Sequence, residues 1–297
     1  MDQALIVFIA VAEKKHFTRA AEELHMTQPA VSQYIRALER TVGTRLLERD
    51  RKQVRLNKAG EIVYRHAKEI VGLYGRMQSL VDDLLHQASG RLAIGASYTF
   101  GEYALPRIIA RLQSLYPSVK PAISIGNTKD ISEAVAAGEL DIGVVEGEFP
   151  HERLRIEPFA EDRMHVVAMA GHRLAQTERG RLGIDELADE TWIVRESGSG
   201  TRKATESMFA RFGFEPRSRM EFGSTQLIKE SVEAGLGVSL LSGWAIRKEL
   251  ALGTLRVLDV AGTPVSRQFY VVIPAADFHT RATEVFRELL LREGAHP

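Results

Sequence analysis

The chain has 297 residues, of which 44% are hydrophobic and 26% charged, with 39 basic and 39 acidic side chains and no cysteine. This length favours two or three domains over a single core, and the zero formal net charge excludes a uniformly basic molecule. The lack of cysteine excludes disulfides, thiol nucleophiles and thiol redox sensors, and it suits a cytoplasmic protein.

The first 17 residues predict a packed helix rather than a signal peptide, because no basic residue precedes their short apolar run. Leu5, Phe8, Ile9 and Ala12 recur at helical spacing. No apolar run in the chain approaches the roughly 20 residues of a membrane span. We therefore expect no membrane partner.

Residues 17–57 predict two helices, a tight turn between them and a short hairpin. Thr18 is expected to cap the first helix, and Thr27 is expected to cap the second. Pro29 lies in the first turn of the second helix, where its missing N–H would have no helical partner. The pattern is that of a helix-turn-helix module.

The second of these helices has one apolar face and one polar face. Its apolar side chains share a stripe at three- and four-residue spacing: Val31, Ile35 and Leu38. The opposite face carries Pro29, Gln33, Arg36 and Arg40, with Gln28 and Ser32 along its edge. Gln and Arg have the forked donors that match adenine and guanine edges in the major groove, so this face is expected to read bases.

The hairpin is expected to form a basic wing built around residues 46–47 and 54–56. Between Gln28 and Lys58 there are eight Lys or Arg against three Asp or Glu, a local balance of +5. A solvated basic face is the alternative, but the helix pair, the proline and the wing together favour DNA binding. The side chains predicted to contact DNA are Thr18, Gln28, Pro29, Ser32, Gln33, Arg36, Arg51 and Arg55.

Over about its first sixty residues the chain resembles LysR-type transcriptional regulators. The match consists of Ala20-Ala21-x-x-Leu24, Thr27-Gln28-Pro29-Ala30-Val31-Ser32, Leu38-Glu39, Gly43, Leu46-Leu47, Arg49 and Ala59-Gly60. Thr27, Leu47 and Asn57 replace the commoner Ser, Phe and Thr but can do the same physical work. The resemblance implies an operator of double-stranded DNA with an interrupted inverted repeat, a homodimer or homotetramer, and contact with RNA polymerase.

Residues 58–87 predict a long helix capped by Asn57. Its apolar stripe has the alternating three- and four-residue spacing of a coiled-coil seam, and consists of Ile70, Leu73, Met77, Leu80 and Leu84. The stripe could pack against the chain's own C-terminal part, but a second copy is favoured, because two-fold proteins recognise two-fold operators. Gly72 and Gly75 mark either a close helix approach or a bend.

After Ala88-Ser89-Gly90 the sequence alternates short apolar runs with helical segments, which predicts an α/β fold with parallel strands. The first series has strands at 91–96, 122–126 and 141–147, with helices at 105–115 and near 131–137. A second series begins at 164–170 and continues through 192–196, 220–223 and 238–242. A strand at 267–274 and a helix at 278–292 remain. The resemblance implies that the chain crosses twice between two α/β lobes, so that this strand and helix return to the first lobe.

The expected organisation is therefore a winged helix-turn-helix domain, a linker helix and a two-lobed α/β effector domain of the periplasmic-binding-protein type. The predicted bounds are 1–58 for the DNA-binding domain, 59–89 for the linker and 90–297 for the effector domain. Within the last, lobe I takes about 90–161 and 267–297, and lobe II takes about 162–266.

Two strand-to-helix turns, 95–101 and 195–202, are rich in Ser, Thr and Gly. Ligands of open α/β sheets bind at such turns, where helix N-termini supply N–H groups, although the same residues are also common helix caps. The predicted effector contacts are Ser97, Thr99, Asn127, Thr128, Glu146, Ser197, Ser199, Thr201 and Ser224. Glu146 would repel an anion unless it is protonated or paired, and Arg195 or Arg202 could pair with it.

The chain lacks an HExxH motif, the lysine of a P-loop and a Gly-x-Ser-x-Gly elbow, so we expect no catalytic residue, metal or cofactor. A ligand-responsive regulator is the leading hypothesis. A solute-binding protein of transport and an enzyme fused to a DNA-binding domain are the alternatives. The segments 96–106 and 195–202 resemble the sulfur-assimilation and carbon-fixation branch of the family, which implies a small oxyanion such as sulfite or sulfate, or else a small organic acid.

Overall fold

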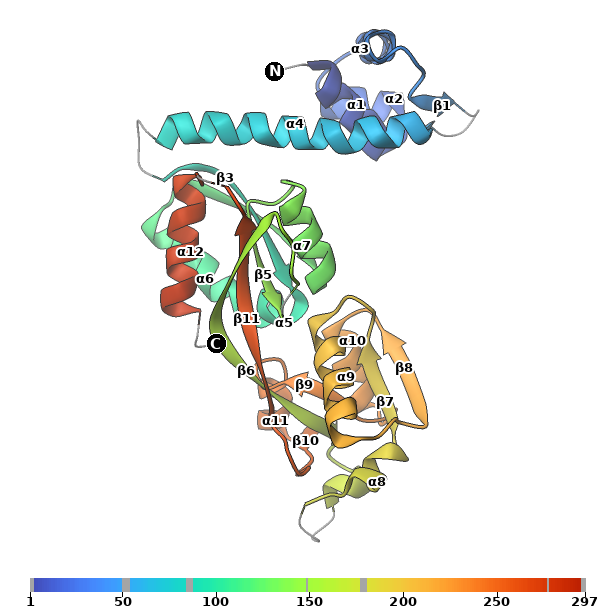
Figure 1. Ribbon diagram of the computed structural model, residues 1–297, viewed down its shortest axis with the longest axis vertical. Coiled ribbons are helices and arrows are strands. Elements are labelled where there is room, and N and C mark those ends of the chain that lie inside the picture. The colour runs from blue at the N-terminus through green and yellow to red at the C-terminus, as the bar shows by residue number, and fades with distance from the viewer. Residues whose placement is uncertain are drawn as a thin grey trace. The chain divides into compact units, whose positions relative to one another are not determined.

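The computed structural model describes residues 3–49, 54–83, 88–147, 149–176, 181–276 and 278–294. The chain divides into two compact units, Met1–Leu85 and His86–Pro297, and each is described by itself (Figure 1). No helix in the described ranges is both long and apolar enough to cross a membrane.

Unit 1 begins with three helices, α1 (Gln3–Lys14), α2 (Phe17–Glu23) and α3 (Gln28–Val42). They enclose one small core, whose fully buried members include Val7, Phe8, Val31, Ile35 and Leu46. The predicted apolar face of α3 is confirmed, because Val31, Ile35 and Leu38 are all buried while Gln33, Arg36 and Arg40 are exposed.

The sequence predicted the N-cap of α3 correctly but not that of α2. The prediction that Thr18 caps α2 was wrong: the extended residue His16 is the cap, and its Nδ1 accepts the N–H of Thr18 at 3.2 Å. The helix therefore starts two residues earlier than a Thr18 cap would place it, and Thr18 is left exposed in its first turn. Thr27 caps α3 as predicted, since its hydroxyl accepts the N–H of Ala30, and α3 ends at Gly43 with φ +81°.

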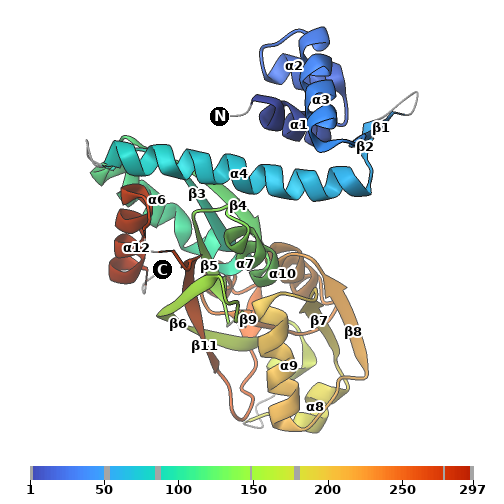
Figure 2. The same ribbon diagram turned by 45° about the horizontal axis from the view of Figure 1, so that its top comes forward.

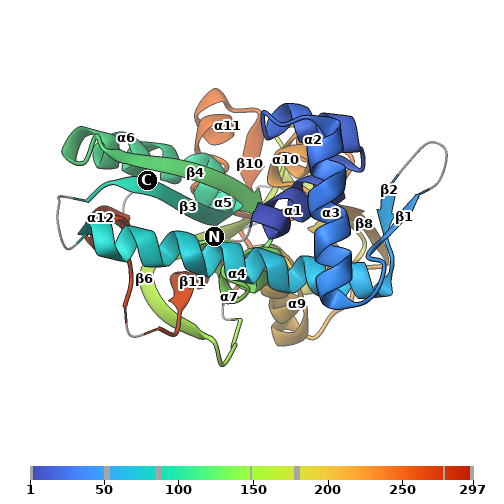
Figure 3. The same ribbon diagram turned by 90° about the horizontal axis from the view of Figure 1, so that it is seen from above.

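The predicted wing is confirmed as a pair of antiparallel strands, β1 (Leu47–Arg49) and β2 (Val54–Leu56), in the register Leu47↔Leu56. Figure 3 shows the two strands side by side, with α3 leading towards them. Arg55 is exposed on β2. The predicted DNA contact Arg51 lies outside the described residues.

The long helix of unit 1 is α4 (Lys58–Asp83), which at 1.5 Å per residue is about 39 Å long. Asn57 caps it as predicted, because its Oδ1 accepts the N–H of Gly60 at 2.8 Å. The helix continues through Gly72 and Gly75, so neither glycine interrupts it. The stripe residues Ile70, Leu73 and Met77 are 52%, 61% and 50% exposed. The side chain of Leu80 and all of Leu84 lie outside the described residues.

Unit 2 begins with the βαβαβ series that the sequence predicted. Its strands are β3 (Gly90–Ser97), β4 (Val119–Gly126) and β5 (Ile142–Glu146), and β3 pairs in parallel with both others. Its helices are α5 (Tyr98–Tyr103), α6 (Leu105–Leu115) and α7 (Thr128–Ala136).

Two long strands follow, β6 (Leu154–Met169) and β11 (Val265–Pro274), which pair antiparallel from Val265↔Met164 to Pro274↔Leu154. The prediction that a second parallel series starts at 164 was wrong in this respect, because the strand starts at Leu154 and its partners are antiparallel. Five of the nine residues between 155 and 163 are charged, which masked the strand in the sequence. The main sheet has the order β10-β6-β11-β5-β3-β4, with β9 also paired to β6.

The chain between β6 and β11 forms a second α/β body. Its strands are β7 (Thr191–Arg195), β8 (Ser218–Phe222), β9 (Ser239–Ser242) and β10 (Leu255–Val257), with β7 parallel to β8. Its helices are α8 (Ile184–Ala188), α9 (Gly200–Phe212), α10 (Thr225–Glu233) and α11 (Arg247–Leu252), with the 3-10 turn η1 (Arg173–Gln176). Trp192 is fully buried in its core and packs edge-on against Phe209.

The last helix, α12 (Arg281–Glu293), packs with β11 in the same core as β3 and α6. We call the body around this core lobe I; it contains β3–β5, α5–α7, α12 and the adjoining parts of β6 and β11. Lobe II is the body formed by β7–β10 and α8–α11. Figure 2 shows β6 and β11 running together from one lobe to the other.

Candidate functional site

One heavily hydrogen-bonded group between the lobes is the carboxylate of Glu146, at the end of β5. It is 2% exposed. Its Oε1 accepts the N–H of Thr99, at the start of α5, at 3.1 Å. Its Oε2 accepts the hydroxyl of Thr201, at the start of α9, at 3.4 Å. One carboxylate therefore joins a helix of lobe I to a helix of lobe II.

The cation that pairs with this carboxylate is Arg267, near the start of β11, whose Nη1 lies 3.2 Å from Glu146 Oε2. The same guanidinium donates to the Thr201 hydroxyl at 3.0 Å and to the Thr99 hydroxyl at 3.3 Å. Its Nε donates to Asp162 at 2.7 Å, and Asp162 also accepts the Ser242 hydroxyl at 2.7 Å. Arg267 thus binds groups from both lobes.

Arg267 is almost fully enclosed, with 7% of its side chain exposed. Burial alone would lower the pKa of Arg267, but the charges of Glu146 and Asp162 outweigh burial and raise this pKa above the usual value of an arginine. The guanidinium is therefore a permanent charge between two carboxylates.

The sequence left Arg195 and Arg202 open as partners of Glu146, and the structure gives both arginines other partners. Arg195 makes a two-point ion pair with Glu196 and lies 4.4 Å from the centre of the Tyr98 ring. Arg202 donates to Glu206 at 2.6 Å and to Glu221 at 3.0 Å. Arg267 was missed because it is 121 residues from Glu146 in sequence. The only signal was one Arg at the edge of an apolar strand.

Three of the predicted effector contacts serve as helix caps. They are Asn127 on α7, Ser199 on α9 and Ser224 on α10, and each side chain accepts an N–H from the first turn of its helix. Thr128 differs, because its hydroxyl donates to the carbonyl oxygen of Glu146 at 2.9 Å. The hydroxyls of Thr99 and Thr201 also have another role, because each accepts a hydrogen bond from the guanidinium of Arg267.

The two remaining serines are placed very differently. Ser97, at the end of β3, is 1% exposed, and its hydroxyl has no hydrogen-bond partner among the described residues. Buried hydroxyls without partners are uncommon, which marks this one as a candidate ligand group. Ser197 is exposed in the turn between β7 and α9.

A cavity of about 300 Å³ opens beside Glu146. It is lined by Thr128, Lys129, Glu146, Phe149, Ser197, Gly198, Ser199, Gly200, Arg202, Lys203 and Glu206. The lining therefore comes from the turn at α7 in lobe I and the turn at α9 in lobe II. One backbone hydrogen bond also crosses between these turns, from the Lys129 N–H to the Gly198 carbonyl at 3.2 Å.

The lobes also meet through α5 and α10. The hydroxyl of Tyr103 donates to Gln226 at 3.3 Å, and the ammonium of Lys229 lies 4.9 Å from the Tyr103 ring centre. Lys229 is buried and donates to Glu249 at 2.6 Å. Burial raises the pKa of Tyr103, against the opposing effect of Lys229.

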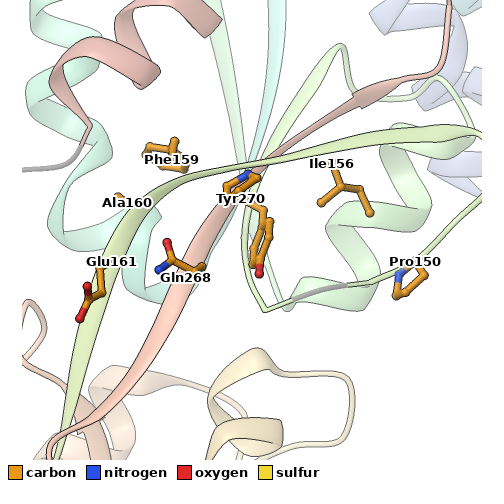
Figure 4. A pocket seen from close by; sticks show the side chains of 8 residues that line it. Pro150, Ile156, Phe159, Ala160, Glu161, Gln268 and Tyr270 are labelled. Carbon is orange, nitrogen blue, oxygen red and sulfur yellow. The ribbon is translucent and has the colours of Figure 1, made fainter.

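A larger groove of about 770 Å³ lies along β6 and β11 but contains none of the predicted site residues (Figure 4). It is lined by Pro150, Ile156, Pro158, Phe159, Ala160, Glu161, Gln268 and Tyr270. Of these two hollows, the smaller cavity is the better candidate, because Glu146, the partner of Arg267, lines it.

The predicted DNA-contacting residues of α3 lie on one exposed surface in unit 1. Gln28, Pro29, Gln33 and Arg36 are exposed, whereas Ser32 is buried and accepts a hydrogen bond from the Gln28 amide at 3.1 Å. This bond fixes the direction of the Gln28 side chain at the start of the helix.

Comparison with known families gives two matches that together span most of the chain. Residues 3–61 match the bacterial regulatory helix-turn-helix protein family, lysR type, and residues 85–295 match the LysR substrate binding domain. The HTH-type transcriptional regulator CysL of Bacillus subtilis is 39% identical over 96% of this chain and 95% of its own length.

Two solved structures are similar as well. The regulatory domain of CcmR from Synechocystis, in complex with 2-PG, is 32% identical, with a TM-score of 0.63 over 69% of this chain and 97% of that one. Full-length CbnR, in complex with its target DNA, has a TM-score of 0.73 over 98% of this chain and 99% of that one. Because CbnR is only 21% identical to this chain, the similarity between the two shows a shared fold and nothing more.

Proposed function

Because the chain belongs to the LysR family of DNA-binding transcriptional regulators, we propose that a small anion bound between lobes I and II controls its action on DNA. The observation that carries the proposal is the guanidinium of Arg267, which contacts Thr99 of lobe I and Thr201 of lobe II together. A ligand at this junction would favour one arrangement of the lobes, by no more than its difference in affinity for the two arrangements.

The proposed effector contacts are the nine residues predicted from the sequence, with Arg267 added. The 2-PG complex of the CcmR domain supports a small anionic ligand, because that domain is a relative of 32% identity. Sulfite, sulfate and 2-PG are the ligands to test first. The proposal assigns no catalytic activity to the chain, since the relatives are regulators of transcription.

The effector site is tested with Thr99→Ala and Thr201→Ala. Each variant should lose the change in DNA footprint caused by sulfite, sulfate or 2-PG, while effector-free operator binding stays nearly intact. Thr205→Ala is the matched control, because Thr205 is a buried threonine of α9 whose hydroxyl donates only to the Thr201 carbonyl. Wild-type ligand responses in both site variants would show that the effector does not bind there.

For DNA binding we propose that the bases are contacted by Gln28, Pro29, Ser32, Gln33 and Arg36. The sugar-phosphate backbone of the DNA is contacted by Thr18, Arg51 and Arg55. Gln33→Ala or Arg36→Ala should cost about 1–3 kcal/mol and relax the sequence preference, whereas Arg55→Ala should weaken all sequences alike. Binding is measured on operator and scrambled duplexes at two salt concentrations. An unchanged operator preference in Gln33→Ala would contradict the assignment of base reading to α3.

The wider proposal places the protein in the cytoplasm as a homodimer or homotetramer. It would bind an interrupted inverted repeat, because a two-fold protein presents two copies of α3 to two half-sites. Contact with RNA polymerase belongs to the same proposal. The exposed stripe on α4 supports self-association, since large apolar side chains are otherwise rarely left in contact with water.

A further inference from the structure

We propose that Glu146 makes this site selective for an oxyanion that still carries a proton, and that it rejects oxyanions without one. The inference rests on the proposed effector site between the lobes and adds its chemical selectivity. Phosphate, which is partly protonated near neutral pH, should therefore bind better than sulfate, which has the same tetrahedral shape and no proton.

The first step concerns the unused hydrogen-bonding capacity of Glu146. An ionised carboxylate is an acceptor only, with about four lone-pair positions on its two oxygens. Oε2 accepts from Thr201 and Arg267, and Oε1 accepts from the Thr99 N–H. Among the described residues, one acceptor position on Oε1 is left, and Glu146 lines the cavity of about 300 Å³.

The second step concerns the donors at the start of α5, two residues apart. The Thr99 hydroxyl oxygen accepts from Arg267, which leaves its own hydrogen available to donate. The Ser97 hydroxyl is buried and unpartnered within the described part of the chain. Neither residue lines the cavity of about 300 Å³, but the Thr99 N–H bond to Glu146 places this turn next to the carboxylate. A ligand oxygen bound beside Glu146 can accept from these hydroxyls, while Glu146 requires a donor from the ligand. The site therefore combines donors and an acceptor.

The third step concerns charge. Glu146 and Asp162 carry two negative charges against the one positive charge of Arg267, so this cluster has a net charge of −1. A ligand oxygen without hydrogen would meet Glu146 as one acceptor against another, with like charges in contact. A ligand O–H would instead donate to Oε1. Lys129 and Lys203 line the same cavity and can attract the ligand's remaining charge.

The test measures calorimetric binding of phosphate and of sulfate to the full-length protein. Wild type should bind phosphate at least tenfold more tightly than sulfate, a difference of about 1.4 kcal/mol. In Glu146→Gln the preference should fall to near unity, because the substitution removes the negative charge that repels an ionised ligand oxygen. Glu157→Gln is the matched control: it removes a paired carboxylate of β6 that does not line this cavity and should keep the wild-type preference.

A second measurement on wild type uses sulfite and needs no variant. Its affinity should fall as rising pH removes its proton, while the affinity for sulfate stays flat over the same range. Three results would overturn the inference: sulfate binding as tightly as phosphate, an unchanged preference in Glu146→Gln, or no binding of either ion. If Thr99→Ala and Thr201→Ala abolish a ligand response while Glu146→Gln keeps the preference, the between-lobe site stands and only this selectivity fails.

Discussion

The Cα of Gly200 lies against the carbonyl oxygen of Glu146, so closely that a Cβ at position 200 would come within 2.1 Å of that oxygen. Gly200 is the first residue of α9 in lobe II, and Glu146 ends β5 in lobe I. The two backbones are thus in direct contact beside the candidate ligand cavity. A glycine is needed here for close approach rather than for an unusual backbone angle.

This contact predicts that Gly200→Ala will destabilise unit 2. Because the obstacle is backbone rather than a flexible side chain, the lobes must shift to admit the methyl group, at a cost of about 1–3 kcal/mol. The matched control is Gly223→Ala, where a new Cβ meets nothing within 4 Å. Urea unfolding monitored by circular dichroism compares the two. Equal midpoints would contradict the close approach.

Arg267→Ala should be strongly destabilising, because it leaves the buried carboxylates of Glu146 and Asp162 without their cation. Breaking a buried ion pair in this way costs about 3–5 kcal/mol. Arg287→Ala is the comparison, since Arg287 pairs with Glu157 at a partly exposed site where the loss should be about 0–1 kcal/mol.

A double variant makes the test of Arg267 specific. Arg267→Met combined with Glu146→Gln should lose less stability than the sum of the two single changes, because the second change removes one of the stranded charges. The free energy of unfolding is measured for all four members of the cycle. Strict additivity would show that the Arg267–Glu146 pair does not determine the loss.

The stripe on α4 predicts self-association through that helix. Leu73→Asp combined with Met77→Asp should shift the protein towards monomers and weaken operator binding, because both side chains are largely exposed in the single chain. Gly75→Asp is the control: it adds one Asp on the opposite face, where a Cβ meets nothing within 4 Å. Sedimentation velocity gives the oligomeric state. A double variant with wild-type sedimentation would place the interface elsewhere.

His165 predicts a dependence of stability on pH. Burial lowers the pKa of His165 below 6.5, and Arg163 lowers it further, while Asp162 opposes the shift. The unfolded chain therefore binds this proton more readily than the folded chain. The stability that the fold has with neutral His165 is fully present above pH 6.5, and it is lost as the pH falls through the folded-state pKa of His165. Between about pH 7.5 and about 5.5, wild type should lose more stability than His165→Gln. Parallel curves for the two proteins would contradict the prediction.

The sequence predicted the elements whose signals are local. The faces of α3, the Thr27 and Asn57 caps, the wing and the parallel strands of lobe I depend on residues close in sequence, and the structure confirms them. The start of β6 was missed because it carries many charged residues along a strand that is only partly buried. Its antiparallel partner β11 is about a hundred residues away, which no local pattern reveals.

The candidate site shows the same division. Turns rich in Ser and Thr were found by composition, but composition could not separate the caps Asn127, Ser199 and Ser224 from Thr99 and Thr201, which point into the Arg267 network. Helix caps and ligand donors use the same side chains for the same physical reason, namely the free N–H groups of a first turn. Which role applies depends on the tertiary position of a distant arginine.

The pairing of β6 with β11 limits how the two lobes can move. The chain passes from lobe I to lobe II in β6 and returns in β11, and the two strands are neighbours in one ladder with a register shift at Phe269/Tyr270, close to Arg267. Such a ribbon resists stretching because its hydrogen bonds and its backbone hold its length, while a bulge bends the strand and increases its local twist. We therefore expect the lobes to twist relative to one another more easily than they separate. Because the proposed ligand site adjoins Arg267 on this ribbon, we expect binding there to change the twist between the lobes rather than the distance between them.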